Sequence, residues 1–503
     1  MDSGPDTIRR NSNSPVDYGR SLRIARQGKG LTQEELATRF GVTKSYVSKI
    51  EMGAVIPSQR FYDQAQAELA GSLSALPKPE FVREPDTSPY QLGFDLSDRN
   101  DWIRNLLPIQ TKVSSGPPEV FRWDIPQTIK ELSYLTHNFF RYYGKFPPTI
   151  PRRLLRDFRP PEGTWVLDNF SGSGTTLVEA KCEGHPSIGV DISPLATLAA
   201  RVKTVHMDLP RLQETYESLI EKFEHQSVDE SLFPPVRESN KWFRFETLEQ
   251  LSRLKGTLLD LPVGPERDFL SVAFFSIIRR VSHAYDGEVR PHVNATKAPR
   301  DVLAAFKKKY ADMATRMSAF HRESSEQVPA LALSGDNRRL TNLLDWSDYR
   351  VGLVISHPPY LNCFDYFPVY KLEYLWAGGF GEPGLDAEYA ELRKQETRCW
   401  PATDKRIFDG YFQSLEQAYG QVAELTDRGT RCCVVLGDCS IKGEIVPVLD
   451  RFSDIMDTVG FDLERLLLRS THYGIGKYAY AHRADYHGKA AQKRDGILLF
   501  KRR

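Results

Sequence analysis

The chain has 503 residues, 40% hydrophobic and 26% charged, which is ordinary for a globular protein with room for two or three domains. Because 67 Lys and Arg residues balance 66 Asp and Glu residues, a DNA-binding surface would have to be a local basic patch. The polar N-terminus predicts no signal peptide, no apolar run approaches the ~20 residues that span a bilayer, and the six cysteines show neither disulfide nor zinc-site spacing. We therefore expect a cytoplasmic protein without membrane association, with reduced thiols and no metal site.

Residues 1–15 are polar and predicted to be disordered, whereas residues 16–72 show helical spacing of apolar side chains. Within them, Thr32 and Glu35 have the spacing of a capping box that opens a short helix. Gly41 permits a tight turn, and Thr43 is a second N-cap candidate for a helix to about Glu51. Two short helices joined in this way predict a DNA-binding helix-turn-helix, the alternative being a helical bundle that serves only dimerisation or a protein partner.

This segment resembles the lambda-repressor-like (Cro-type) family, through Leu36-Ala37, Gly41-Val42, Ser48, Ile50-Glu51, Gly53 and Pro57. The resemblance implies that Gln33 contacts a backbone phosphate of double-stranded DNA. It also implies that five residues face the major groove: Thr43, Lys44, Ser45, Tyr46 and Lys49. Repressor-type domains bind paired half-sites, so a dimer through this domain is one expected assembly.

Residues 73–122 are rich in Pro, Ser and Asp and are predicted to be a linker, and residues 123–503 a large domain. In this domain strands alternate with helices, which predicts an α/β fold with a mostly parallel sheet. Residues 205–330 are predicted to be a helical insertion. The predicted strands are Thr164–Phe170, Pro186–Ile192, 329–336, 351–357 and 431–438, with 495–503 as a closing edge strand.

The segment Asp168–Thr176, DNFSGSGTT, lies directly between a predicted strand and a predicted helix. Its glycines would let a ligand approach the backbone, and it lacks the Gly-Lys-Ser/Thr ending of a phosphate-binding loop. Asp191 follows the next strand about twenty residues later, a spacing that suits a carboxylate accepting hydrogen bonds from ribose hydroxyls. The pattern predicts a nucleotide-like cofactor at this turn.

A second pattern, Pro358-Pro359-Tyr360, ends the hydrophobic run 351–356. Two prolines stiffen the backbone and remove two N–H donors, which leaves carbonyl oxygens facing a substrate. The motif resembles that of amino-group DNA methyltransferases, whose substrate is the exocyclic amine of cytosine or adenine, a poor nucleophile. The resemblance implies that acceptors such as a proline carbonyl and the His357 side chain activate this amine, and that Tyr360 stacks on a base flipped out of the duplex. No Pro-Cys nucleophile occurs, which argues against C5 methylation.

Together these segments resemble the amino-group DNA methyltransferases. Phe170, Gly172, Gly174, Thr175 and Thr176 match Phe-x-Gly-x-Gly-Thr-Thr, and residues 357–360 match Ser/Asp/Asn-Pro-Pro-Tyr except that His357 holds the first position. The resemblance implies a Rossmann-like S-adenosylmethionine-dependent sheet in residues 123–503, with His357, Pro358, Pro359 and Tyr360 as catalytic residues. The implied cofactor contacts are Tyr143, Lys145, Phe146, Asp168, Phe170, Gly172, Gly174, Thr175, Asp191 and Asp336.

The continuation after the prolines, Asn362, Asp365-Tyr366 and Lys371 to Glu373, resembles the cytosine-N4 group more than the adenine-N6 group. The resemblance implies a role in restriction-modification or phage defence, with a companion restriction endonuclease as a possible partner. Three alternatives stay open: adenine-N6 methylation, methylation of RNA, and a DNA-binding regulator whose methyltransferase body His357 has altered.

The roles of two segments have two possible interpretations each. The stretch Arg279–Arg300, inside the insertion, mixes basic and aromatic residues and is either part of a target-recognition surface or a solvated helical face. The helix-turn-helix either binds an operator near its own gene or tethers the enzyme to its methylation target.

Overall fold

The computed structural model describes residues 15–40, 42, 44–52, 59–69, 109–114, 119–125, 131–145, 147–286, 288–294, 296–298, 300–381, 385, 389–469 and 494–503. The chain divides into two compact units, Met1–Asp101 and Trp102–Arg503. The prediction of disorder for residues 1–15 falls outside the described residues, apart from Pro15.

The described residues of the N-terminal unit form four helices, α1 (Pro15–Gly28), α2 (Gln33–Phe40), α3 (Lys44–Glu51) and α4 (Gln59–Leu69). One buried side chain or more from each helix enters its core, among them Leu22, Leu36, Val47 and Ala65. The capping box is confirmed: the Thr32 amide donates to Glu35 Oε2 at 2.7 Å and the Glu35 amide to Thr32 Oγ1 at 3.2 Å. Helices α2 and α3 form the predicted helix-turn-helix.

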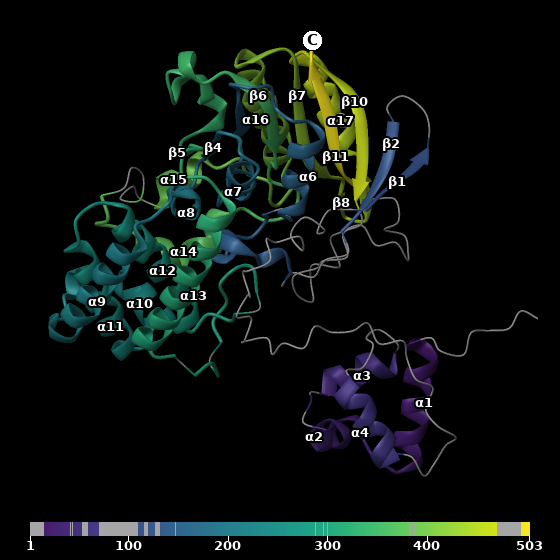
Figure 1. The fold of residues 1–503 in the computed structure, drawn as a ribbon, viewed down its shortest axis with the longest axis vertical. Coiled ribbons are helices and arrows are strands. Elements are labelled where there is room, and N and C mark those ends of the chain that lie inside the picture. The colour runs from purple at the N-terminus through teal and green to yellow at the C-terminus, as the bar shows by residue number, and fades with distance from the viewer. Residues whose placement is uncertain are drawn as a thin grey trace, which may run out of the picture. The chain divides into compact units, whose positions relative to one another are not determined.

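The second unit is built on a nine-stranded sheet in the order β1-β2-β10-β11-β7-β6-β3-β4-β5 (Figure 1). Strands β7, β6, β3, β4 and β5 are parallel to one another, and β11 runs antiparallel between β10 and β7. The strands are β1 (Ile109–Ser114), β2 (Glu119–Asp124), β3 (Trp165–Asp168), β4 (Ser187–Asp191), β5 (Ala330–Ser334), β6 (Val351–Ser356), β7 (Thr426–Gly437), β10 (Phe461–Arg469) and β11 (Asp495–Arg502), with a separate hairpin of β8 (Cys439–Ile441) and β9 (Glu444–Val446).

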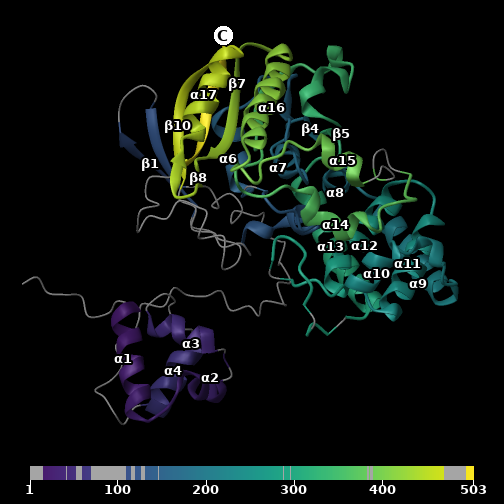
Figure 2. The ribbon, with the colours of Figure 1, turned by 180° about the vertical axis from the view of Figure 1, so that it is seen from behind.

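Helices cover both faces of this sheet, and the alternation of strand side chains decides which face each residue serves. In β6, Leu353 and Ile355 pack with α6 on one face, whereas Val354 packs with α16 and α17 on the other. Figure 2 shows α16 and α17 lying along the strands. The flanking helices are α6 (Thr149–Asp157), α7 (Thr175–Cys182), α8 (Pro194–Thr204), α16 (Lys405–Glu424) and α17 (Val448–Thr458).

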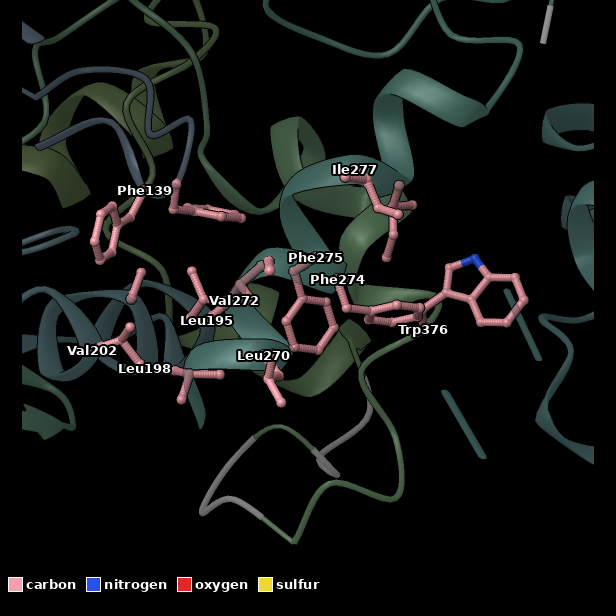
Figure 3. Close-up of a cluster of buried hydrophobic side chains, with 14 of the residues drawn as sticks. Phe139, Leu195, Leu198, Val202, Leu270, Val272, Phe274, Phe275, Ile277 and Trp376 are labelled. Atoms are coloured by element: carbon pink, nitrogen blue, oxygen red, sulfur yellow. The ribbon is translucent and has the colours of Figure 1, made fainter. Parts of the chain in front are cut away.

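The predicted helical insertion is confirmed, and it shares one large core with α8 and with residues near the cavity described below. In Figure 3, Phe274 and Phe275 of the insertion lie close to Trp376, and Leu195 and Leu198 of α8 lie beside Leu270. Its helices are α9 (Leu209–His225), α10 (Val236–Trp242), α11 (Phe245–Leu259), α12 (Pro265–Val281) and α13 (Val302–Glu323), followed later by α14 (Lys371–Tyr374) and α15 (Tyr389–Gln395). Short 3-10 turns are η1 (Glu131–Ser133), η2 (Leu135–Asn138), η3 (Glu230–Leu232), η4 (Asn337–Asn342), η5 (Trp346–Asp348) and η6 (Phe367–Tyr370).

Two predictions about the sheet were wrong. The predicted linker 73–122 contains β1 and the start of β2, and β2 pairs with β10 because Trp123 is buried against the sheet. The predicted edge strand 495–503 is instead the interior strand β11. Its residues Gly496–Phe500 are buried, as an apolar run covered on both faces should be. Among the described residues, no helix is both long and apolar enough to cross a membrane.

Candidate active site

The carboxyl ends of β3, β4, β5 and β6 meet at one edge of the sheet, where the chain order reverses between β3 and β6. Ligands of open α/β sheets bind at such a point. The turns that follow these strands line one cavity with about 840 Å³ of empty space, its open mouth included. Eight of the residues predicted to bind cofactor or to act in catalysis line it: Lys145, Phe170, Gly172, Thr175, Asp191, Asp336, His357 and Pro359.

Asp168 holds the glycine turn together and does not line the cavity. Its side chain is fully buried, and its two oxygens accept hydrogen bonds from Thr176 Oγ1 at 2.5 Å and from the Phe170 amide at 3.1 Å. Burial raises the pKa of this carboxyl to about 7. In the structure Asp168 makes contacts within the turn, and its cofactor contact stays a prediction. Gly174 likewise lies outside the cavity, at the left-handed N-cap of α7 and against Ala200.

Asp191 lines the cavity as predicted. Its two carboxylate oxygens accept the amide hydrogens of Gly172 and Ser193, each at 2.9 Å, which joins the turn after β3 to the turn after β4. Burial raises the pKa of Asp191 to about 6. Each oxygen keeps acceptor capacity for a further donor, because a carboxylate oxygen has two lone pairs.

Beyond β5, Asp336 lines the cavity but is already engaged by Arg338, whose guanidinium donates to Asp336 Oδ2 at 2.7 Å. Its neighbour Asn337, which the sequence analysis did not single out, also lines the cavity and donates to the Asn169 carbonyl at 3.0 Å. Asn169 and Ser171 are buried and line the same wall. Among the described residues, no partner binds Asn169 Nδ2 or Ser171 Oγ.

The segment before α6 closes the cavity from another side, with Tyr142 in place of the predicted Tyr143. The Tyr142 ring is stacked on Tyr366 and Tyr370, with centroids 6.0 and 5.3 Å apart, whereas the Tyr143 hydroxyl turns away to the Glu288 carbonyl. Tyr142 faces the cavity because it stacks on rings that are distant in the chain. The sequence alone does not show which of two adjacent tyrosines makes such contacts. Phe146 lies outside the described residues.

Lys145 lines the cavity while its ammonium donates to the His137 carbonyl at 2.8 Å, and burial lowers its pKa to about 8. Behind it the segment is fixed by Glu179, a fully buried carboxylate on α7. Glu179 binds His137 Nε2 and Arg152 Nε, each at 2.6 Å. The cavity wall is thus anchored to the first helix after the glycine turn.

At the end of β6, His357 and Pro359 line the cavity, and Pro358 is buried beside them. The Pro359 carbonyl accepts a hydrogen bond from the buried Tyr411 hydroxyl at 2.8 Å. The Pro358 carbonyl is therefore the better candidate to accept a hydrogen bond from a substrate. Ser356 cannot replace the side chain of His357, because its hydroxyl points inward to Asn169 Oδ1 at 2.6 Å and to Tyr419 at 2.8 Å.

Tyr360 does not line the cavity, although its ring is 5.3 Å from the His357 ring in an edge-on arrangement. Its hydroxyl accepts from Arg469 at 3.0 Å and donates to Asp495 Oδ1 at 3.4 Å. Arg469 and Asp495 form a buried ion pair between β10 and β11. The segment 357–360, which is predicted to be catalytic, is thereby tied to the interior strand β11.

Other cavity residues were missed by the sequence analysis because they come from the segment 366–374 and from the end of α15. Tyr374 donates to or accepts from Ser193 Oγ at 2.8 Å, and Glu396 binds the backbone of this segment. Aromatic residues and a single glutamate carry no spacing that marks a site. The residues of this group are Tyr366, Phe367, Tyr370, Tyr374, Gln395, Glu396 and Thr397.

In the helix-turn-helix, the predicted phosphate contact Gln33 donates to Glu51 Oε2 at 2.8 Å, next to the buried Arg26–Glu51 ion pair. Of the predicted groove residues, Lys44 is exposed 3.2 Å from Glu34, and Tyr46 packs edge-on against Phe61. Thr43 and the side chains of Ser45 and Lys49 lie outside the described residues.

The stretch Arg279–Arg300 contains cations bound by the backbone and a half-buried cation, Arg290, that lies on an aromatic ring. Arg279 is buried and donates to the carbonyls of Glu288 and Val289, and Lys297 Nζ donates to two carbonyls and to Asp286. Arg290, in contrast, lies over the ring of Trp400, with its guanidinium carbon 4.2 Å from the centroid. Trp400 is 40% exposed.

Comparison with known proteins gives two family matches and several relatives. Residues 22–63 match a helix-turn-helix family, and residues 87–200, which begin inside the predicted linker, match a DNA methylase family. Type II methyltransferase M.BsoBI of Geobacillus stearothermophilus is 24% identical over 58% of this chain and 62% of its own length. M.MvaI of Kocuria varians is 21% identical over 45% of this chain and 53% of its own length. M.MjaII of Methanocaldococcus jannaschii is 32% identical over 27% of this chain and 27% of its own length. The chain thus spans less than two thirds of each.

Proposed function

We propose that this chain, which joins a helix-turn-helix region to a region of the DNA methylase family, is a DNA methyltransferase. It transfers a methyl group from S-adenosylmethionine to the exocyclic amino group of a DNA base, with cytosine N4 favoured over adenine N6. One observation carries the proposal: the glycine turn after β3 and the proline turn after β6 line the same cavity, with Gly172 and Asp191 on one side and His357 and Pro359 on the other.

The residues on the β3–β4 side suit a cofactor with a nucleoside and an amino acid portion. Asp191 keeps acceptor capacity for ribose hydroxyls, and the buried Asn169 Nδ2 and Ser171 Oγ have hydrogen-bonding capacity that no described residue uses. Gly172 brings bare backbone to the same wall. S-adenosylmethionine, when bound, supplies an electrophilic methyl group.

The residues on the β6 side suit activation of an amine. The Pro358 carbonyl and the His357 imidazole would accept hydrogen bonds from the amino group and make its lone pair available. Only a neutral imidazole can accept such a bond. Tyr360, whose hydroxyl is held by Arg469 and Asp495, would keep its ring in place for the flipped base.

DNA contact is assigned to two places. In the helix-turn-helix, α3 carries Lys44 at its exposed start. In the second unit, Arg290 and Trp400 join a guanidinium to a partly exposed ring, a combination that suits stacking on an unpaired or adjacent base. Trp400 is linked to the segment after the proline turn, because its amide donates to Asp365 Oδ1 at 3.2 Å.

A DNA-binding regulator with an altered methyltransferase body is the second candidate, and His357 is the observation that favours it. The enzymes that this chain resembles have Ser, Asp or Asn at this position. This chain has His357, whose imidazole cannot accept a hydrogen bond when it is protonated. The cavity itself is compatible with cofactor binding in either case.

The deciding experiment is to express the full chain in cells, digest their DNA to nucleosides and identify methylated bases by mass spectrometry. We expect N4-methylcytosine with the wild type and with Cys363→Ser, whose exposed thiol has no role in the proposed chemistry. We expect a large loss with Tyr360→Ala, because base stacking is worth ~1–3 kcal/mol. N6-methyladenine would correct the base, and no methylated base would favour the regulator.

A further inference from the structure

One buried carboxylate in the cavity has a function that neither the glycine turn nor the proline turn explains. Glu396 follows α15, is 6% exposed and lines the cavity. Its Oε1 accepts the amide hydrogens of Tyr366 and of Phe367, the latter at 3.2 Å. No group among the described residues hydrogen-bonds its Oε2. Because a buried polar atom without a partner is costly, its retention at a cavity wall points to a ligand.

The position of Glu396 is fixed from both sides of the cavity. The preceding residue, Gln395, offers its carbonyl to Arg338 at 2.8 Å, and Arg338 also holds Asp336 after β5. The following residues are fixed by the buried Asp365, which accepts hydrogen bonds from Arg398 Nε and from the amides of residues 399 and 400, each at 3.2 Å. These contacts fix the backbone on either side of Glu396, whose side chain lines the cavity and also lines a neighbouring pocket with Arg398 and Asp404.

The surroundings of this carboxyl favour its neutral form. Burial, with a smaller contribution from Asp365, raises its pKa to about 8. Since Oε1 already accepts two amide hydrogens, the proton of the neutral form resides on Oε2. The titratable groups around it include Asp365, Tyr366, Tyr374, Tyr389, Arg393 and Cys399, and the cavity adds Lys145, Asp191, Asp336 and His357.

We propose that Glu396 is a ligand-binding residue whose Oε2 accepts a hydrogen bond from an N–H or O–H group of the molecule in the cavity. This inference rests on the proposed function and deepens it. Two molecules there carry such donors: the target base through its exocyclic amine, and the cofactor through its ribose hydroxyls and ammonium group. Either donor stabilises the ionised carboxylate, so binding releases a proton from Glu396.

Glu396→Gln separates the ligand contact from the structural one. The amide oxygen can still accept from Tyr366 and Phe367, while an NH₂ group takes the position of Oε2 and faces the ligand donor with another donor. The matched control is Glu391→Gln, which makes the same chemical change on α15. Glu391 is 56% exposed, pairs with Lys394 and does not line the cavity.

The experiment has two arms, both with the full chain. Calorimetry measures binding of S-adenosylhomocysteine without DNA, in two buffers of different ionisation enthalpy near pH 7.5, and initial rates measure methylation of duplex DNA. A loss of about tenfold or more in affinity, with loss of proton release, assigns the contact to the cofactor. Retained affinity with a tenfold lower kcat assigns it to the base.

Wild-type affinity, proton release and rate in Glu396→Gln, each within twofold, would overturn the inference. An equal loss of affinity or rate in Glu391→Gln would also overturn it, because the loss would then follow from the removal of one negative charge and not from a contact of Glu396. If the wild type neither binds S-adenosylhomocysteine nor methylates DNA, the proposed function fails first and this inference falls with it.

Discussion

A methyl group added at Gly172 should damage the cavity without unfolding the protein. Gly172 has φ +49°, and a Cβ built on it would lie 2.6 Å from Tyr142 Cε1 and 3.2 Å from two neighbouring ring atoms. Alanine in the left-handed region costs ~1–2 kcal/mol. Moving Tyr142 also disturbs two ring pairs, with Tyr366 and Tyr370, worth ~0.5–1.5 kcal/mol each. The total cost of Gly172→Ala is about 2–5 kcal/mol of unfolding free energy.

Gly184→Ala is the matched control for the backbone part of this cost. Gly184 has φ +80°, yet nothing lies within 4 Å of a Cβ built on it. Its alanine variant should therefore lose only the ~1–2 kcal/mol of left-handed strain. The remaining ~1–3 kcal/mol of the stability cost of Gly172→Ala belongs to the disturbed ring pairs of the cavity wall.

Denaturant unfolding of both variants measures the stability change, and calorimetry with S-adenosylhomocysteine measures the affinity. We expect weakened binding in Gly172→Ala and wild-type binding in Gly184→Ala. The reasoning is refuted if folded Gly172→Ala binds as tightly as the wild type, or if both variants lose affinity equally.

Four further outcomes are expected. Burial raises the pKa of Asp168 from 3.8 to about 7, so its ionisation makes the folded state progressively less stable as the pH rises from about 4 to 7. In denaturant unfolding measured over this pH range, Asp168→Asn should reduce the decline in unfolding free energy by up to about 4 kcal/mol, and an unchanged decline would contradict the reasoning. His357→Asn keeps a side-chain acceptor at this position and should retain methylation in initial-rate measurements, whereas His357→Leu removes the acceptor and should lose it; equal rates in the two variants would reject the assigned role. Trp400→Ala should weaken duplex binding about tenfold by fluorescence anisotropy while Phe245→Ala, which removes an exposed ring from α11, leaves it unchanged; equal effects would reject the assigned contact. If the helix-turn-helix binds an operator, the full chain will protect the promoter of its own gene in a footprinting experiment, and removal of residues 1–75 will leave methylation intact. An unprotected promoter and a sharp loss of methylation on the same deletion would favour the tether.

Short-range patterns in the sequence were sufficient for much of the fold. The Thr32–Glu35 capping box joins residues three positions apart, so the pattern and the hydrogen bonds coincide. The parallel strands β3, β4 and β6 were predicted because each is an apolar run that ends in a turn-forming segment. The same locality located Gly172, Asp191 and the proline turn at strand ends that meet at one edge of the sheet.

Placement in space depended on partners far away in the chain. The run 495–503 is equally apolar at an edge or in the interior, and only its pairing with β7 and β10 decides between them. Asp168 and Asp191 both end strands, but Thr176 turns the first inward while the second faces the cavity. Their roles could not be told apart from the residue type alone.

The proline turn after β6 shows the same division between local and distant causes. The sequence by itself determined that a rigid, donor-free Pro-Pro turn ends β6, since proline fixes its own backbone. The Pro359 carbonyl is engaged by Tyr411, 52 residues later in the chain. The Glu396 carboxylate is held in place by amides 29 and 30 residues earlier in the chain. Local hydrogen bonds and backbone preferences are encoded within a few residues, whereas the direction of a side chain into a cavity is set by contacts that form only when distant segments pack.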